Sequence, residues 1–361
     1  MAIKRIIRIA ASAAGALFLL GGCARIAIPE PDGRKGAVIG FNPGTMLLKD
    51  DASTKSATFK DGFEVGDIVT VYGRRHGNDG TTDVFSSTPV EKKSASEWEY
   101  DAIKFWNWLT EGDYYDFLGV YPSGKGTAKM DIPGNLAIKT HYSISANNNF
   151  DLMYALYRRY YGSEADRLSA VPLEFHHTLS AVRIVFDNDS NSKDITINSY
   201  QFTHMIVSAD AKATINSIGN PEISWINTIR NADAVRSVTP NKELKGMNNS
   251  GDHSYTGAFD FFIPTALDAT SDGSADDQER MPHLVINYTP AGKSSATQVS
   301  LLLKDIERDP LNGDYTPVEV WEPGVRYTYH VSIRMDGGVH IIVVTTDWED
   351  IYAETPGIMI D

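Results

Sequence analysis

The alternation of apolar and polar residues is the feature that most constrains what this chain can fold into. Between Arg326 and Arg334, large apolar side chains occupy every second position, namely Tyr327, Tyr329, Val331 and Ile333. A period of two places such residues on one face of a half-buried strand. A turn at residues 336–338 then leads to the apolar run 339–344. The two segments predict an antiparallel hairpin whose second strand is buried on both faces.

The rest of the pattern predicts an all-β chain. Glycine, proline, asparagine and aspartate separate short apolar segments, which show no regular alternation with helices. This arrangement favours antiparallel β-sandwiches over a parallel α/β sheet. Further strands are expected at residues 67–72, 182–186, 195–207, 283–288 and 298–303. One helix is predicted at residues 150–160, where Leu152, Met153, Leu156 and Tyr160 would share one side.

The N-terminus has the features of an export signal. Three basic residues precede an apolar run at residues 9–20, which is too short for a stable membrane span. The run ends in Leu20-Gly21-Gly22-Cys23, which resembles the lipobox of bacterial lipoproteins. The resemblance implies cleavage before Cys23 and attachment of lipid to its sulfur. Acyl chains contribute about 0.8 kcal/mol for each buried methylene group, so they anchor a protein without a membrane-crossing helix.

Charge and length limit the remaining possibilities. Without the three basic residues of the signal, the formal charge of −14 becomes about −17. Such a surface disfavours nucleic acid as a partner, because phosphate binding needs basic residues. The length predicts two domains, whose cores contain no disulfide because Cys23 is the only cysteine. The expected organisation is a signal peptide at residues 1–22, a lipid tether at 23–35, an N-terminal β-sandwich at 36–168 and a C-terminal β-sandwich at 169–361.

One segment imitates a phosphate-binding loop. Residues 119–126 have the glycine and lysine spacing of that motif, but Gly126 stands where serine or threonine would bind magnesium. Pro133 and Gly134 follow too soon for the helix that such a loop requires. We interpret the segment as a glycine-rich turn between strands.

No pattern of catalytic or metal-binding residues stands out. The acidic stretches 187–191 and 272–277 lack the spacing and the closing glutamate of an EF-hand, so we interpret them as hairpin tips. His176 and His177 are adjacent, and on a strand they would point to opposite faces. Paired carboxylates are the one catalytic arrangement that the sequence leaves open. We therefore expect no enzyme, no cofactor and no metal site.

Three tryptophans, Trp98, Trp106 and Trp108, lie in the aromatic stretch 97–108. Exposed rings would form a platform that stacks on sugars, whereas buried rings would fill a core. Because burial of an aromatic ring is strongly favourable, we favour the core interpretation and keep the sugar platform as the alternative.

Several short segments follow the lipobox in a distinctive order. They are residues 53–57, 63–67, 104–106, 117–122, 151–155, 173–182 and 321–329. In this order they resemble the fimbrillin-like lipoproteins, the type V pilins of Bacteroidota. The resemblance implies two transthyretin-like antiparallel β-sandwich domains in tandem, in a protein that serves as an anchor, stalk or tip subunit of surface fimbriae.

The resemblance also implies a mode of assembly. A protease removes the first strand of a stalk subunit, and a strand of the next subunit fills the vacated groove, which is β-augmentation. In this chain the removable strand would contain Val38, Ile39 and Phe41, and cleavage would follow Lys49 or Lys55. The donor would be Gly357-Ile358-Met359-Ile360. A permanent first strand and a closing edge strand are the alternatives for the two segments.

These observations predict a lipidated subunit of a fimbria, or a fimbria-like adhesin, at the surface of the outer membrane. Its expected partners are other fimbrial subunits by strand addition, the outer membrane through the lipid anchor, and a ligand on a host or bacterial surface. The alternatives are a glycan-binding lipoprotein of an uptake system, which needs an exposed tryptophan platform, and a hydrolase with facing carboxylates in a cleft.

Overall fold

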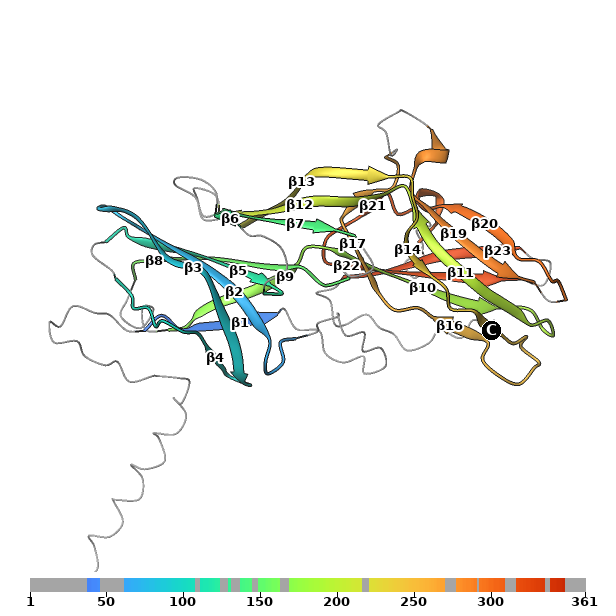
Figure 1. The fold of residues 1–361 in the computed structure, drawn as a ribbon, viewed down its shortest axis with the longest axis horizontal. Coiled ribbons are helices and arrows are strands. Elements are labelled where there is room, and N and C mark those ends of the chain that lie inside the picture. The colour runs from blue at the N-terminus through green and yellow to red at the C-terminus, as the bar shows by residue number, and fades with distance from the viewer. Residues whose placement is uncertain are drawn as a thin grey trace, which may run out of the picture.

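The computed structural model describes residues 38–45, 62–107, 111–123, 129–130, 137–144, 149–162, 169–215, 221–269, 277–290, 292–308, 316–334 and 338–347. Within these ranges the fold is all-β, as predicted, with two short 3-10 helices, η1 (Gln278–Arg280) and η2 (Leu303–Asp305). Two lobes lie side by side along the longest axis of the molecule (Figure 1).

The N-terminal lobe contains a seven-stranded sheet and a four-stranded sheet. The first has the order β1 (Phe41–Thr45), β9 (Val171–His177), β8 (Met153–Tyr160), β5 (Tyr114–Tyr121), β2 (Ile68–Gly77), β3 (Gly80–Ser94) and β4 (Glu97–Glu99). The second has the order β13 (Pro221–Asn231), β12 (Met205–Ile215), β7 (Ala137–Ser143) and β6 (Lys129–Met130).

The C-terminal lobe is a sandwich of two sheets. One has the order β16 (Ser254–Thr256), β10 (Ser180–Asn188), β22 (Val325–Ile333) and β23 (Val339–Asp347), and β17 (Asp260–Phe262) also pairs with β10. The other has the order β14 (Val235–Val238), β11 (Ile195–Thr203), β19 (His283–Thr289) and β20 (Thr297–Leu302), and β15 (Lys242–Leu244) also pairs with β11. A separate short pair joins β18 (Thr265–Ala266) to β21 (Val320–Trp321).

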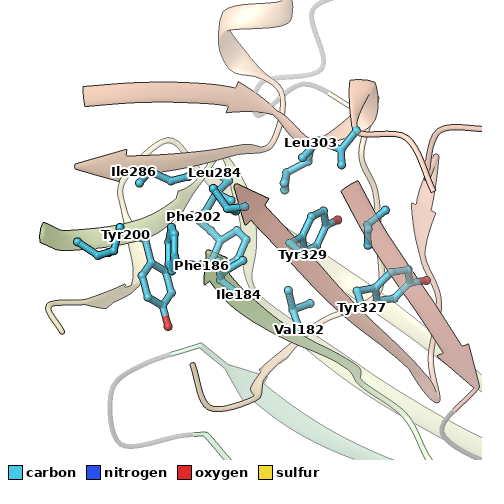
Figure 2. Close-up of a cluster of buried hydrophobic side chains, with 14 of the residues drawn as sticks. Val182, Ile184, Phe186, Tyr200, Phe202, Leu284, Ile286, Leu303, Tyr327 and Tyr329 are labelled. Atoms are coloured by element: carbon cyan, nitrogen blue, oxygen red, sulfur yellow. The ribbon is translucent and has the colours of Figure 1, made fainter. Parts of the chain in front are cut away.

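The described residues form three hydrophobic cores, and the first two lie on opposite faces of the seven-stranded sheet. The first core includes Phe41, Phe85 and Phe117. The second lies between that sheet and the four-stranded sheet, and it also takes in Phe261 of β17. The third fills the C-terminal sandwich, where Tyr329 of β22 is fully buried (Figure 2).

The predicted hairpin is confirmed, because β22 and β23 pair antiparallel from Val325 opposite Asp347 to Ile333 opposite Val339. The expected burial of its second strand on both faces is wrong, because β23 is the edge strand of its sheet and Ile342 and Val344 are only half-buried. The strand predicted at residues 195–207 is two strands, β11 and β12. They separate at His204, whose backbone has a φ of 59°, a left-handed conformation that interrupts a strand.

The helix predicted at residues 150–160 is wrong, because this segment forms β8. Met153 and Ala155 face the first core, whereas Tyr154 and Leu156 face the second. A strand that is apolar on both faces has no visible alternation, and its apolar run is then compatible with a helical pattern.

Strand pairing crosses the boundary predicted between residues 168 and 169. β9 follows this boundary but belongs to the seven-stranded sheet of the N-terminal lobe. β12 also follows it, yet it pairs with β7 from Ser208 opposite Ser143 to Thr214 opposite Ala137. The sheets therefore do not separate at this point of the sequence.

Candidate functional site

The first strand closes a gap between two parts of the seven-stranded sheet, β9 on one side and the residues around Lys104 on the other, and we call this gap the seam. This sheet curls until its two edge strands, β1 and β4, lie against each other. On one side β1 pairs parallel with β9, from Phe41 opposite Val171 to Thr45 opposite Phe175. On the other side the backbone N–H of Ile39 donates to the carbonyl oxygen of Lys104 at 2.9 Å. β1 and the residues just before it therefore close a barrel-like layer around the first core.

The side chains of this segment are part of that core. Ile39 is 0% exposed and Phe41 is 6% exposed. The ring of Phe41 makes edge-to-face contacts with Phe85, Tyr100 and Phe117 at centroid distances of 5.1, 5.7 and 5.8 Å. Such a pair contributes about 0.5–1.5 kcal/mol beyond the burial of its area. The segment therefore cannot leave without exposing an aromatic groove.

Two glycines give this groove its depth. A β-carbon at Gly73 would lie 2.8 Å from the ring of Phe85, and one at Gly119 would lie 2.5 Å from the ring of Phe175. Both glycines are inside strands, β2 and β5, where glycine is otherwise unfavourable. The missing side chains leave room for the two rings.

Tyr100 ties the segment to the opposite edge of the seam. Its hydroxyl donates a hydrogen bond of 2.7 Å to the carbonyl oxygen of Ile39 and accepts one of 3.2 Å from the backbone N–H of Lys104. An unpaired backbone carbonyl in this position would be costly, so this bond stabilises the closed seam. Only the folded structure shows this role, because 61 residues separate the two partners.

Arg159 holds the start of β9 in place beside β1. Its guanidinium donates to the carbonyl oxygens of Ser169 at 2.7 Å and Ala170 at 2.9 Å, and it lies 5.1 Å from the ring centroid of Trp106. The backbone N–H of Val171 then donates to the carbonyl oxygen of Gly40 at 2.8 Å. The edge that receives β1 is thus fixed by a buried cation.

The structure brings together only some of the predicted site residues. Val38, Ile39 and Phe41 lie in the seam, where Val38 forms an antiparallel bridge with Phe105. The lipidation residue, the two lysines and the donor segment lie outside the described residues, namely Cys23, Lys49, Lys55, Gly357, Ile358, Met359 and Ile360.

The three tryptophans do not form an exposed platform. Trp106 is 2% exposed and belongs to the first core. Trp98 is half-buried and packs against Phe63 at a centroid distance of 5.3 Å. Trp108 lies outside the described residues. The sugar-binding alternative in the form predicted from the sequence is therefore wrong, because its central ring is inside the protein.

Several buried pairs of polar side chains could not be predicted from the sequence. The guanidinium of Arg158 donates to both carboxylate oxygens of Asp116, at 2.6 and 2.9 Å, and Nε2 of His76 lies 3.2 Å from the same carboxylate. Nδ1 of His177 lies 2.8 Å from Oδ2 of Asp151 where the chain passes between the lobes. Both carboxylates have fully buried side chains, so we assign the two pairs to structural stabilisation.

The acidic stretch 187–191 is held by its own hydrogen bonds. The side-chain amide of Asn188 donates to the carbonyl oxygens of Lys193 and Leu244, at 2.8 and 3.0 Å. Burial raises the pKa of the neighbouring Asp187. Among the described residues, no group of three or more histidine, cysteine, aspartate or glutamate side chains is arranged to hold a metal ion. Over the same residues, no helix is long and apolar enough to cross a membrane.

Fold and seam together define an all-β protein whose first strand closes one of its cores. Among solved structures, a fimbrial protein from Bacteroides vulgatus has a similar fold, with a TM-score of 0.50 and 14% sequence identity over 86% of this chain and 99% of that chain. The tip fimbrial protein Mfa3 from Porphyromonas gingivalis also matches, with a TM-score of 0.38 and 11% identity over 79% of this chain and 95% of that chain.

The sequence itself gives the family. The pattern of the fimbrillin-like family matches residues 54–348, which is most of the chain. The chain therefore belongs to the fimbrillin-like family. No curated protein matches it in sequence.

Proposed function

We propose that this chain is a lipidated subunit of a surface fimbria and that it joins its neighbours by strand addition. The observation that supports the proposal is the position of β1, which fills the seam between β9 and the segment after β4 with buried apolar side chains. Loss of such a strand leaves an unpaired edge beside an apolar groove, and a strand from another subunit restores both the hydrogen bonds and the burial.

The other parts of this proposal come from the sequence. Cys23 carries the lipid that attaches the chain to the outer membrane, Lys49 or Lys55 is the cleavage site, and Gly357-Ile358-Met359-Ile360 is the donor. The two lobes are the two transthyretin-like sandwiches, and β9 and β12 belong to the N-terminal one although they follow the boundary expected between residues 168 and 169. The protein has no catalytic activity and acts through its partners.

Limited proteolysis tests the proposal. A soluble form of the chain, residues 24–361, is treated with trypsin at a limiting concentration, and the N-terminal mass and the oligomer size are followed together. Loss of a segment that ends at Lys49 or Lys55, followed by oligomers that resist SDS, is the expected result. An intact N-terminus in a persistent monomer would contradict strand exchange and leave β1 as a permanent strand.

Two sets of variants make the test specific. Lys49→Gln with Lys55→Gln should block cleavage at these two positions, because trypsin needs a basic residue, and should reduce oligomers. Cleavage after Lys60, which remains in this variant, is recognised by its different N-terminal mass. Ile358→Asp with Ile360→Asp should permit cleavage but block oligomers, since charged side chains do not enter an apolar groove. Oligomers that persist in the second variant would sink the assignment of the donor.

The lipid anchor needs a separate measurement. A Cys23→Ala variant should incorporate no labelled fatty acid and should leave the membrane fraction. Continued labelling of that variant would show that lipid is attached elsewhere or that the assignment is wrong.

A further inference from the structure

The sheet formed by β16, β10, β22 and β23 has one face toward the third core and an outer face that carries basic and apolar side chains. Tyr327, Tyr329 and Val331 of β22 point into the third core, so the residues between them, Thr328 and His330, point outward. Arg326 lies on the same outer face, and the register places Ala181 of β10 opposite it. This outer face continues from the second core, to which Ala181 belongs.

Cations gather at the end of this face that is nearest the N-terminal lobe. The guanidinium of Arg183 lies 4.5 Å from the ring centroid of Phe259, and that of Arg326 lies 5.9 Å from the same ring. Among the described residues at outward positions of β10, β22 and β23, Asp187 is the one acidic residue. It lies at the end of the face opposite Arg183 and Arg326. Half-buried apolar residues separate the two ends, namely Val185, Ile342 and Val344. A basic and apolar surface on a strongly acidic protein favours an acidic, apolar partner.

The chain itself supplies such a partner at this place. The last residue of β23, Asp347, lies opposite Val325 of β22, at the end of the sheet where β10 begins. Residue 348 therefore begins at the cationic end of the face. Residues 348–361 contain four acidic residues and no lysine or arginine, together with five large apolar residues of tryptophan, isoleucine and tyrosine type.

The length of this segment also fits the face. Fourteen residues, from 348 to 361, reach at most about 46–50 Å when extended. The nine residues of β10 span about 30 Å. The segment is thus long enough to turn at Asp347 and follow the whole face. We propose that residues 348–361 dock on the outer face of β10, β22 and β23 of the same subunit, with Glu349 and Asp350 beside Arg183 and Arg326.

The consequence of this docking rests on the proposed function. A docked segment is held by its own subunit, so the seam of a neighbouring subunit must compete for it. Docking would then delay strand donation until a free seam is present. The docking itself does not depend on polymerisation, and it is measurable in a monomer.

Disulfide trapping tests the proposal, because the soluble form of residues 24–361 has no cysteine of its own. A variant with Val185→Cys and Ala353→Cys should form a disulfide within one chain, seen as a faster band on a non-reducing gel and as a linked peptide by mass spectrometry. The matched control pairs Ala353→Cys with Ser224→Cys, an exposed position of β13. The first variant should give at least a tenfold higher yield.

Charge exchange tests the proposed contacts. Arg183→Gln with Arg326→Gln should lower the trapping yield about fivefold, and Arg183→Glu with Arg326→Glu should lower it further. Adding Glu349→Lys and Asp350→Lys to the variant with the two glutamates should restore the trapping yield. The yield of the parent pair should also fall in about 1 M salt, where the screening length is about 3 Å. Thermal unfolding followed by circular dichroism identifies any variant that has lost its fold. If the glutamate variants do not fold, the glutamine variants, which remove the charges without reversing them, still test the contacts.

Three outcomes would overturn the proposal. The first is an equal disulfide yield for the pairs that use positions 185 and 224. The second is a yield that does not respond to the charge exchange in folded variants. The third is a disulfide that forms only between chains, which would make a second copy the occupant. Trapping in a monomer that never forms oligomers would support docking and contradict the proposed function, so the two failures are distinguishable.

Discussion

The ring of Phe175 lies so close to Gly119 that a β-carbon on Gly119 would be 2.5 Å from the Cζ atom of the ring. Phe175 also packs edge-to-face against Phe63 at a centroid distance of 5.2 Å. The strand that carries Phe175 is the one that receives β1. The missing side chain at Gly119 of β5 therefore leaves room for a ring on the strand that pairs with β1.

Gly119→Ala should destabilise the fold, because the added methyl group must displace the ring of Phe175. Overpacking of this kind costs about 1–3 kcal/mol. Gly40→Ala is the matched control, since its β-carbon would meet Ala170 at an ordinary distance of 3.7 Å. Urea unfolding followed by tryptophan fluorescence measures both. Equal free energies of unfolding for the two variants would contradict the packing of the seam described here.

Phe41→Ala should remove most of what holds the first strand in its seam. Replacement of a buried phenylalanine by alanine costs about 3–5 kcal/mol. Asn42→Ala is the control on the same strand, because Asn42 is exposed and its replacement should change stability little. Hydrogen exchange should show faster exchange of the Val171 amide, which donates to Gly40, in the first variant only. Unchanged protection of that amide would argue that β9 holds its position without β1.

Asp116→Ala should be among the most damaging changes to a charged residue, because it leaves Arg158 buried without its carboxylate. Breaking one side of a buried pair costs about 3–5 kcal/mol. Asp83→Ala is the control, since Asp83 pairs with Arg74 through a side chain that is 44% exposed. Exposed pairs contribute about 0–1 kcal/mol. A thermal midpoint that falls equally in both variants would mean that Asp116 is not buried as the structure has it.

Asp260 should make the stability depend on pH. Burial raises the pKa of its carboxyl group to about 6 from an ordinary value of 3.8, and Arg236 partly opposes this rise. The folded protein then holds the proton more tightly than the unfolded chain, so this stabilising contribution is present below pH 4 and is lost as the pH rises to about 6. The loss is at most about 3 kcal/mol, from 1.36 kcal/mol for each pKa unit.

Asp260→Asn should flatten this pH dependence, because the amide side chain does not titrate. Urea unfolding between pH 4 and pH 7.5 measures the effect, and Asp101→Asn, at an exposed position, serves as the control. The same fall in stability in the asparagine variant and in the parent chain would assign the dependence to another group.

Sequence reasoning succeeded where a strand is buried on one face only. In β22 the alternation is visible, and the hairpin with β23 follows from it. In β8 the alternation is hidden, because both faces are covered by apolar neighbours, and the same residues then fit a helical period. The error therefore comes from the position of the strand in the middle of three layers, which no local pattern reveals.

The seam could be predicted in part. The resemblance to the family pointed to Val38, Ile39 and Phe41, and the structure places these residues at the closing edge of the sheet. The partners Tyr100 and Arg159 could not be predicted, because their roles depend on contacts between segments that are distant in sequence. The pair of Asp116 and Arg158 was missed for the same reason, since 42 residues separate them.

The second core joins the two lobes into one folding unit. It takes Leu118 and Tyr154 from the seven-stranded sheet, Ala211 from β12 and Phe261 from β17. A chain cut between residues 168 and 169 would leave each fragment with half of this core in water, so neither fragment contains a complete folding unit. Heating should therefore melt the protein in a single cooperative transition, and a subunit pulled at both ends should transmit the load through this packed middle without a flexible joint.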